Sequence, residues 1–116
     1  MNTPGANSNG VAEEVFALAL AAYRRVVEGD TTLRQGLWEK KKLMGRELAG
    51  KTLGIVGLGN IGQLVAKRSQ GFGMDLLGYD PIISRERAAD AGVKLVSLRI
   101  RTTVAWVRSR VVPPAP

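Results

Sequence analysis

Residues 51–62 read KTLGIVGLGNIG, and this stretch decides the fold. Residues 52–56 form a short apolar run typical of a buried strand, and G-x-G-x-x-G follows at once over residues 57–62. A helix is predicted from about Asn60 to Gln70, because apolar residues recur there at helical spacing and glycines follow at 71 and 73. A strand that enters a glycine turn and leaves it as a helix presents free backbone amides to a phosphate.

Each glycine of this motif has its own expected role. Gly57 permits the tight turn, Gly59 lets the backbone approach a pyrophosphate, and Gly62 lets the helix pack closely on the strand. The amides of Asn60 and Ile61 then face the phosphates at the positive end of the helix. A glycine turn without a ligand is the plainer alternative, and the flanking strand and helix count against it.

The next strand, predicted at residues 74–79, ends at Asp80-Pro81. An acid at this place accepts hydrogen bonds from the adenosine ribose hydroxyls, and its charge repels a 2′-phosphate. The spacing from the glycine turn therefore predicts NAD rather than NADP as the cofactor. Arg85 and Arg87, a few residues later, weaken that preference.

Ser84 is predicted to cap a short helix that runs through Ala91, and residues 93–96 to form a third strand. Strand–helix–strand–helix–strand at these lengths indicates an α/β fold with a parallel sheet. The prediction is a partial Rossmann fold, its first βαβαβ half in strand order 3-2-1, preceded by one long helix. The other edge of the first strand is open unless the tail or another chain covers it, which predicts marginal stability and self-association through that edge and the long helix.

Residues 11–29, VAEEVFALALAAYRRVVEG, are predicted to form the long helix, capped by Ser8 or Asn9 and ended by Gly29. Its apolar side chains fall on two stripes, which predicts neighbours on more than one side. The first stripe is Val11, Val15, Leu18, Ala22 and Val26, and the second is Phe16, Leu20, Tyr23 and Val27. The polar residues 30–50 are predicted to be a connector with at most one helical turn.

A second glycine motif, GRELAGKT at residues 45–52, matches the phosphate-loop pattern G-x-x-x-x-G-K-[ST]. That loop requires a buried strand before it and a helix after it. Here a charged segment precedes the motif and a strand follows it. We therefore interpret this match as coincidental.

The composition excludes several classes of site. The chain has no Cys and no His, which excludes disulfides, thiolate metal sites and any triad or proton relay based on His. No catalytic residue and no metal ligand is assigned. The net charge of +7 is concentrated late in the chain, since residues 1–90 hold 12 basic and 10 acidic side chains. Neither nucleic acid nor a membrane is therefore expected as a partner, and the cytoplasm is the expected compartment.

With these motifs in this order, the chain resembles the D-isomer-specific 2-hydroxyacid dehydrogenases. The matching stretches are NTPGANS and AEE within the first 14 residues, then residues 36–68, 72–84 and 91–98. The resemblance implies an NAD-binding Rossmann domain, an initial helix used in domain and dimer contacts, and oxidation of a D-2-hydroxy acid. By resemblance, the phosphate-binding turn is Gly57, Gly59, Asn60, Ile61 and Gly62, the ribose-binding acid is Asp80, and Pro81 lies beside the adenine.

The ends depart from the family pattern. A substrate-binding region precedes NTPGANS in the family, and its catalytic Arg, Glu and His lie beyond a DEL…LHLP stretch that residues 99–116 do not show. A reading-frame slip or truncated gene is expected. The predicted division is a loop, long helix and connector at 1–50, a dinucleotide-binding half-domain at 51–98, and a divergent basic tail at 99–116. Two functions remain open: a catalytically incomplete NAD-binding fragment, or a non-catalytic module that pairs with itself or a full-length relative through residues 11–28.

Overall fold

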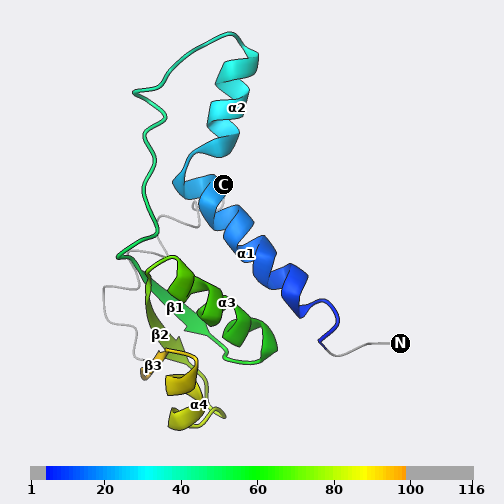
Figure 1. Cartoon of the computed structure of the whole chain (residues 1–116), viewed down its shortest axis with the longest axis vertical. Coiled ribbons are helices and arrows are strands. Elements are labelled where there is room, and N and C mark those ends of the chain that lie inside the picture. The colour runs from blue at the N-terminus through cyan, green and yellow to red at the C-terminus, as the bar shows by residue number, and fades with distance from the viewer. Residues whose placement is uncertain (1–4, 99–116) are drawn as a thin grey trace.

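The computed structural model describes residues 5–98, so the tail at 99–116 lies outside the described residues. Figure 1 shows two helices that lead into a small sheet covered by two further helices. In chain order the elements are α1 (Ser8–Tyr23), α2 (Val26–Arg34), β1 (Thr52–Val56), α3 (Asn60–Gly71), β2 (Asp75–Tyr79), α4 (Arg85–Asp90) and β3 (Lys94–Leu95).

The sheet is parallel and has the order β1-β2-β3. The α/β class and the partial Rossmann arrangement predicted from the sequence are therefore confirmed. In the register of β1 on β2, Leu53 pairs with Leu76 and Ile55 with Gly78. Gly78 is required, because a Cβ there would lie 2.4 Å from the Val93 side chain. β3 is shorter than the predicted 93–96.

One cluster of buried side chains joins the sheet to α3, α4 and the glycine turn. Its members are Leu58, Ala66, Leu76, Ala88 and Val93. A second cluster joins α1 to α3 and consists of Ala12, Phe16 and Val65, with Phe72 packed against it. The rings of Phe16 and Phe72 stack with their centroids 5.1 Å apart. The first cluster packs α4 beside α3 on the sheet, and the second packs α1 against α3.

β1 has one free edge within residues 5–98, since β2 is its single partner there. The strand is also open on the face that points away from α3. Val56 is 77% exposed, and a Cβ at Gly54 would meet no atom within 4 Å. The free edge expected for the first strand is therefore present in the described part of the chain.

The single helix predicted over residues 11–29 is wrong, because the chain breaks between α1 and α2. Arg25 adopts a left-handed backbone conformation with φ of 54°. The carbonyl of Tyr23 accepts a hydrogen bond from the amide of Arg46 at 2.8 Å, so the connector docks at the break. Gly45 makes this approach possible, because a Cβ there would lie 2.5 Å from the Tyr23 oxygen.

Three further expectations for this region are corrected. The helix starts at Ser8 with Asn7 at the cap position, so neither Ser8 nor Asn9 caps it. Gly29 does not end a helix but lies within α2, which carries helical structure to Arg34 in the predicted connector. The two corrections at α2 share the same long-range contact, since a new helix begins where the connector interrupts the first.

α1 packs on one side only. Ser8, Ala12 and Phe16 are buried, whereas the first predicted stripe points away from the sheet. Of that stripe, Val11 and Val15 are just over a third exposed and Leu18 is 63% exposed. The sequence predicts that the helix has neighbours on more than one side. Within the described residues, α1 has a buried contact on one side only. No helix in that part of the chain is long and apolar enough to cross a membrane.

The Ser84 cap is present as predicted, and its removal is expected to destabilise α4. The Ser84 hydroxyl oxygen accepts a hydrogen bond from the amide of Arg87 at 3.3 Å. Ser84→Ala should lower the free energy of unfolding by about 1 kcal/mol, as is typical for loss of an N-cap. Urea unfolding followed by circular dichroism measures this. The control is Ser97→Ala at an exposed serine, and equal effects of the two variants would contradict the prediction.

Candidate dinucleotide-binding site

The glycine turn continues directly from β1 and is anchored to β2. The amide of Gly57 donates to the carbonyl of Tyr79 at 2.8 Å, which extends the ladder between the two strands by one residue. Gly57 then turns the chain with φ of 94°, a conformation that residues with a side chain rarely adopt. The tight turn expected at Gly57 is therefore part of the structure.

Gly62 brings α3 against the end of β1. A Cβ at this position would lie 2.1 Å from the carbonyl oxygen of Gly57 and 3.5 Å from the Ile55 side chain. Any residue other than glycine would push the helix away from the turn. The close approach of helix and strand that the sequence predicts at Gly62 is thus observed.

Gly59 borders open space, in contrast to Gly62. A Cβ at Gly59 would meet no atom within 4 Å, and its φ of −72° is ordinary for any residue. Protein packing therefore does not require glycine here. A ligand that approaches the backbone would require it.

The N-terminus of α3 lies beside this open space and has no side-chain cap. The first amides of a helix have no partner within the helix. Within residues 5–98, no hydrogen bond uses the amides of Gly59, Asn60 or Ile61. An anion placed next to Gly59 would accept hydrogen bonds from these amides at the positive end of the helix.

Leu58 fixes the turn from three sides. Its side chain is only 2% exposed and lies in the cluster shared by the sheet, α3 and α4. Its carbonyl accepts a hydrogen bond from the Gln63 side-chain amide at 2.8 Å. Its own amide donates to a carboxylate oxygen of Asp80 at 2.7 Å.

Asp80 lies at the carboxyl end of β2, beside the glycine turn. Its other oxygen, Oδ1, accepts hydrogen bonds from the amides of Ile82 at 2.8 Å and Ile83 at 3.1 Å. The amides of Ile82, Leu58 and Ile83 hold the pKa of this carboxyl below its ordinary value. Asp80 therefore stays ionised at neutral pH, as an acceptor for ribose hydroxyls must. Pro81 follows it and is exposed.

The lowered pKa of Asp80 predicts a loss of stability in acid. A carboxyl whose pKa is lower in the folded state than its ordinary 3.8 stabilises the fold above that value. This contribution disappears as the pH falls through the folded pKa. Urea midpoints measured from about pH 6 to about pH 2.5 should therefore fall less for Asp80→Asn than for the wild-type chain. Asp75→Asn, at the exposed start of the same strand, is the control and should follow the wild type.

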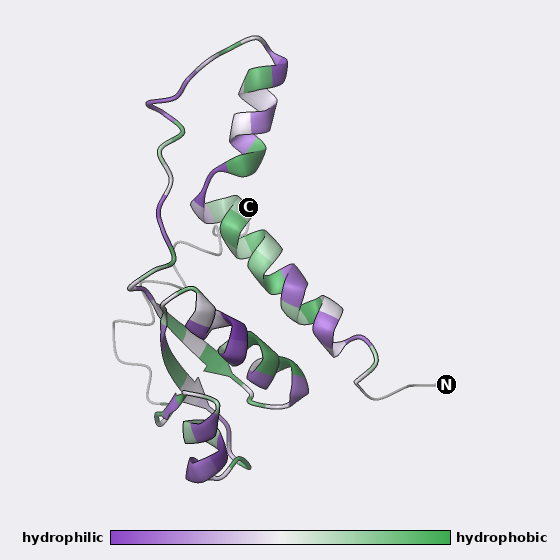
Figure 2. Ribbon diagram, in the orientation of Figure 1, coloured by the Kyte–Doolittle hydropathy of each residue, from purple (hydrophilic) through white to green (hydrophobic). Residues whose placement is uncertain are grey.

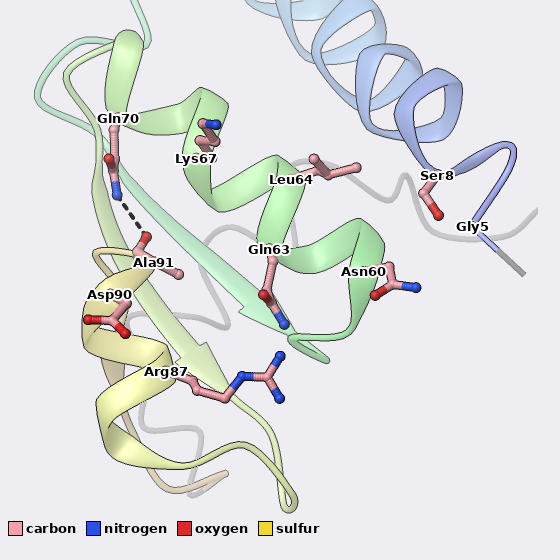
Figure 3. A pocket seen from close by; sticks show the side chains of 10 residues that line it. All are labelled: Gly5, Ser8, Asn60, Gln63, Leu64, Lys67, Gln70, Arg87, Asp90 and Ala91. Atoms are coloured by element: carbon pink, nitrogen blue, oxygen red, sulfur yellow. Dashed lines mark hydrogen bonds between the residues drawn. The ribbon is translucent and has the colours of Figure 1, made fainter.

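A shallow pocket of about 860 Å³ lies between α3, α4 and the start of α1. Its lining residues are Gly5, Ser8, Asn60, Gln63, Leu64, Lys67, Gln70, Arg87, Asp90 and Ala91. Figure 3 shows the Arg87 side chain extended from α4 toward Gln63 and the first turn of α3. The sequence motifs alone do not identify Gln63, Lys67 or Gln70 as site residues. Their polar spacing along one face of α3 is the signal that could have found them.

The structure thus brings the predicted site residues together at the carboxyl ends of β1 and β2: Gly57, Gly59, Asn60, Ile61, Gly62, Asp80 and Pro81. The other motif, at residues 45–52, lies before a strand, since β1 begins at Thr52. No cluster of three or more His, Cys, Asp or Glu that could hold a metal ion occurs in residues 5–98.

A family model agrees with this arrangement. The NAD-binding domain of the D-isomer-specific 2-hydroxyacid dehydrogenases matches residues 16–112. This match extends past Leu98, where the recognisable motifs end.

Curated proteins of the same family are similar to this chain in sequence. D-3-phosphoglycerate dehydrogenase of Archaeoglobus fulgidus is 50% identical over 96 residues, which are 83% of this chain and 18% of that protein. The human enzyme of the same name is 49% identical over 98 residues, 84% of this chain and again 18% of the relative. The chain therefore spans less than a fifth of the length of these relatives.

Solved structures show the same fold. Apo D-lactate dehydrogenase from Escherichia coli superimposes with a TM-score of 0.74 at 32% identity, over 82% of this chain and 30% of that one. D-lactate dehydrogenase from Aquifex aeolicus, solved with NAD and lactic acid, has a TM-score of 0.73 at 31% identity, over 82% of this chain and 28% of that one.

Proposed function

The chain belongs to the D-isomer-specific 2-hydroxyacid dehydrogenase family, whose NAD-binding domain it matches. We propose that its glycine turn and Asp80 together hold the adenosine diphosphate part of NAD. The observation that carries the proposal is the N-terminus of α3, where amides without a hydrogen-bond partner in residues 5–98 border the open space at Gly59. The pyrophosphate would accept hydrogen bonds from Asn60 and Ile61. Asp80 would take a ribose hydroxyl and Pro81 would lie beside the adenine.

We propose that the reaction to which this chain contributes is the oxidation of a D-2-hydroxy acid of the phosphoglycerate type. Bound NAD supplies the hydride acceptor for such a reaction. The residues of this chain bind and orient the cofactor. The 116 residues contain no His, so we propose that groups outside them supply the acid–base function and bind the substrate carboxylate. The chain by itself is then a cofactor-binding unit centred on residues 51–98.

Isothermal titration calorimetry of the purified chain with NAD and NADP tests the proposal. Saturable binding of NAD is expected, with weaker binding of NADP because the Asp80 carboxylate repels a 2′-phosphate. A folded chain that binds neither dinucleotide would contradict the proposal.

Association through α1 is a second candidate function, favoured by the exposed stripe formed by Val11, Val15 and Leu18. Figure 2 shows that hydrophobic residues dominate the second half of this helix. Apolar side chains at helical spacing on a helix surface are typical of contacts between helices. We propose self-association, or pairing with a full-length relative, through this part of the predicted 11–28 segment.

Sedimentation of a charged variant tests the second candidate. Leu18→Lys places a charge in the middle of the stripe and should shift the chain toward monomer. Ala17→Lys is the matched control, because Ala17 is exposed and lies off the stripe. Equal sedimentation of both variants and the wild type would exclude this surface as the site of association.

A further inference from the structure

Asp80 makes one hydrogen bond that its expected contact with ribose does not explain. Its Oδ2 atom accepts from the amide of Leu58, 22 residues earlier in the chain, at 2.7 Å. Its two bonds with Ile82 and Ile83 are local to the loop after β2. The bond to Leu58 joins that loop to the glycine turn after β1. We propose that Asp80 is a positioning residue, which orients the glycine turn for the pyrophosphate in addition to binding the ribose.

The turn needs such a bond because of its sequence. The amide of Leu58 belongs to the peptide that links it to Gly57, and Gly59 follows it. Glycine has the largest range of backbone conformations, so local sterics leave this peptide free to rotate. The bond from Leu58 to Asp80 restricts it, and the restricted turn leads directly into the amides of Asn60 and Ile61.

The other contacts of Leu58 do not replace this bond. The Leu58 side chain is anchored in the core, and its carbonyl is held by the Gln63 side chain. Both contacts lie on the carboxyl side of the peptide that carries the Leu58 amide. That amide has the Asp80 carboxylate as its partner. Its direction therefore depends on residue 80.

The carboxylate has room for both tasks. Two carboxylate oxygens offer about four acceptor sites. Three are taken by Leu58, Ile82 and Ile83, with one of these bonds on Oδ2 and two on Oδ1. Oδ2 can therefore hold the Leu58 amide and one ribose hydroxyl at the same time. Recognition of the ribose and of the pyrophosphate are then coupled through one carboxylate, an inference that rests on the proposed function.

The test separates the two roles with a ligand that lacks the ribose hydroxyls. Calorimetry compares ADP with 2′,3′-dideoxyadenosine 5′-diphosphate on the wild-type chain and on Asp80→Ala. If Asp80 acted on the ribose alone, the variant would bind the dideoxy analogue as tightly as the wild type. We expect Asp80→Ala to weaken binding of the analogue by about fivefold or more, since the turn loses a charge-assisted hydrogen bond.

Two further variants keep the result interpretable. Asp80→Asn retains a carbonyl oxygen that can accept from Leu58, so its affinity for the analogue should lie between those of Asp80→Ala and the wild type. Asp75→Ala, at the exposed opposite end of β2, should bind like the wild type. Hydrogen exchange adds a direct readout: the Leu58 amide should exchange faster in Asp80→Ala, while the Gly57 amide bonded to Tyr79 stays protected.

The outcomes are distinct. A wild-type chain that binds neither ADP nor NAD would overturn the proposed function and this inference together. A wild-type chain that binds both, with Asp80→Ala equal to it for the dideoxy analogue and unchanged in Leu58 exchange, would overturn the positioning role alone.

Discussion

Gly59→Val is expected to abolish NAD binding and to leave the chain folded. The protein has space for the new side chain, because a Cβ at Gly59 meets no atom within 4 Å. That same space is where the pyrophosphate would approach the amides of Asn60 and Ile61. A branched side chain there excludes the phosphates, so calorimetry should show a loss of affinity of about 100-fold or more, or about 2.7 kcal/mol.

A glycine of β1 provides the matched control. Gly54→Val places the same side chain on the open face of the sheet, where it also meets no atom within 4 Å. This variant should bind NAD like the wild type. Both variants should keep a cooperative urea transition, with a cost of about 1 kcal/mol at Gly59 for valine at a helix cap position. If Gly59→Val binds NAD as tightly as the wild type, the space beside Gly59 is excluded as the cofactor site.

Gly62→Ala should have the largest effect on stability. The added methyl would lie 2.1 Å from the carbonyl oxygen of Gly57, which is backbone and cannot rotate away. α3 must then move off the end of β1, where the core cluster around Leu58 joins them. We expect a loss of about 3 kcal/mol in the free energy of unfolding, at the upper end for overpacking. This is a large share of the stability of a small domain.

The control for Gly62→Ala is Gly71→Ala in the same helix. Gly71 ends α3, and a Cβ there would meet no atom within 4 Å. Alanine is favoured over glycine in a helix by about 1 kcal/mol, so this variant should be as stable as the wild type or slightly more stable. Thermal and urea unfolding of the two variants measure the difference. Equal stability would mean that Gly62 does not set the distance between helix and strand.

The elements from residue 51 onward could be predicted because their signals are local. β1 is a short, mainly apolar run, glycines bound α3, and the Ser84 hydroxyl lies where a helix cap is needed. The parallel order of the strands follows from the lengths of the connecting helices. The same local chemistry identified the positions of the candidate site, since Gly57, Gly59 and Gly62 have different roles at fixed spacing.

The first half of the chain was predicted less well because its structure depends on distant contacts. Nothing in the local sequence around Arg25 ends a helix. The break exists because the connector returns to the end of α1, where the Arg46 amide donates a hydrogen bond to the Tyr23 carbonyl. Gly45 permits this close approach. The two apolar stripes predicted for the first helix do not coincide with its buried side, since Ala12 belongs to neither stripe and Val27 of the second stripe lies exposed in α2. Only the packing of Ala12 and Phe16 on α3 distinguishes the buried side from the exposed one.

The sequence by itself thus determined the α/β class, the partial Rossmann order and the positions of the dinucleotide turn. Each strand, turn and helix is indicated by a few residues that are neighbours in the chain. The tertiary structure alone decided where the first helix breaks, which of its side chains are buried, and that the Asp80 carboxylate is bonded to Leu58. Each of these is a contact between residues far apart in the chain. Such contacts are set by which surfaces meet when the backbone packs, and local pattern does not contain that information.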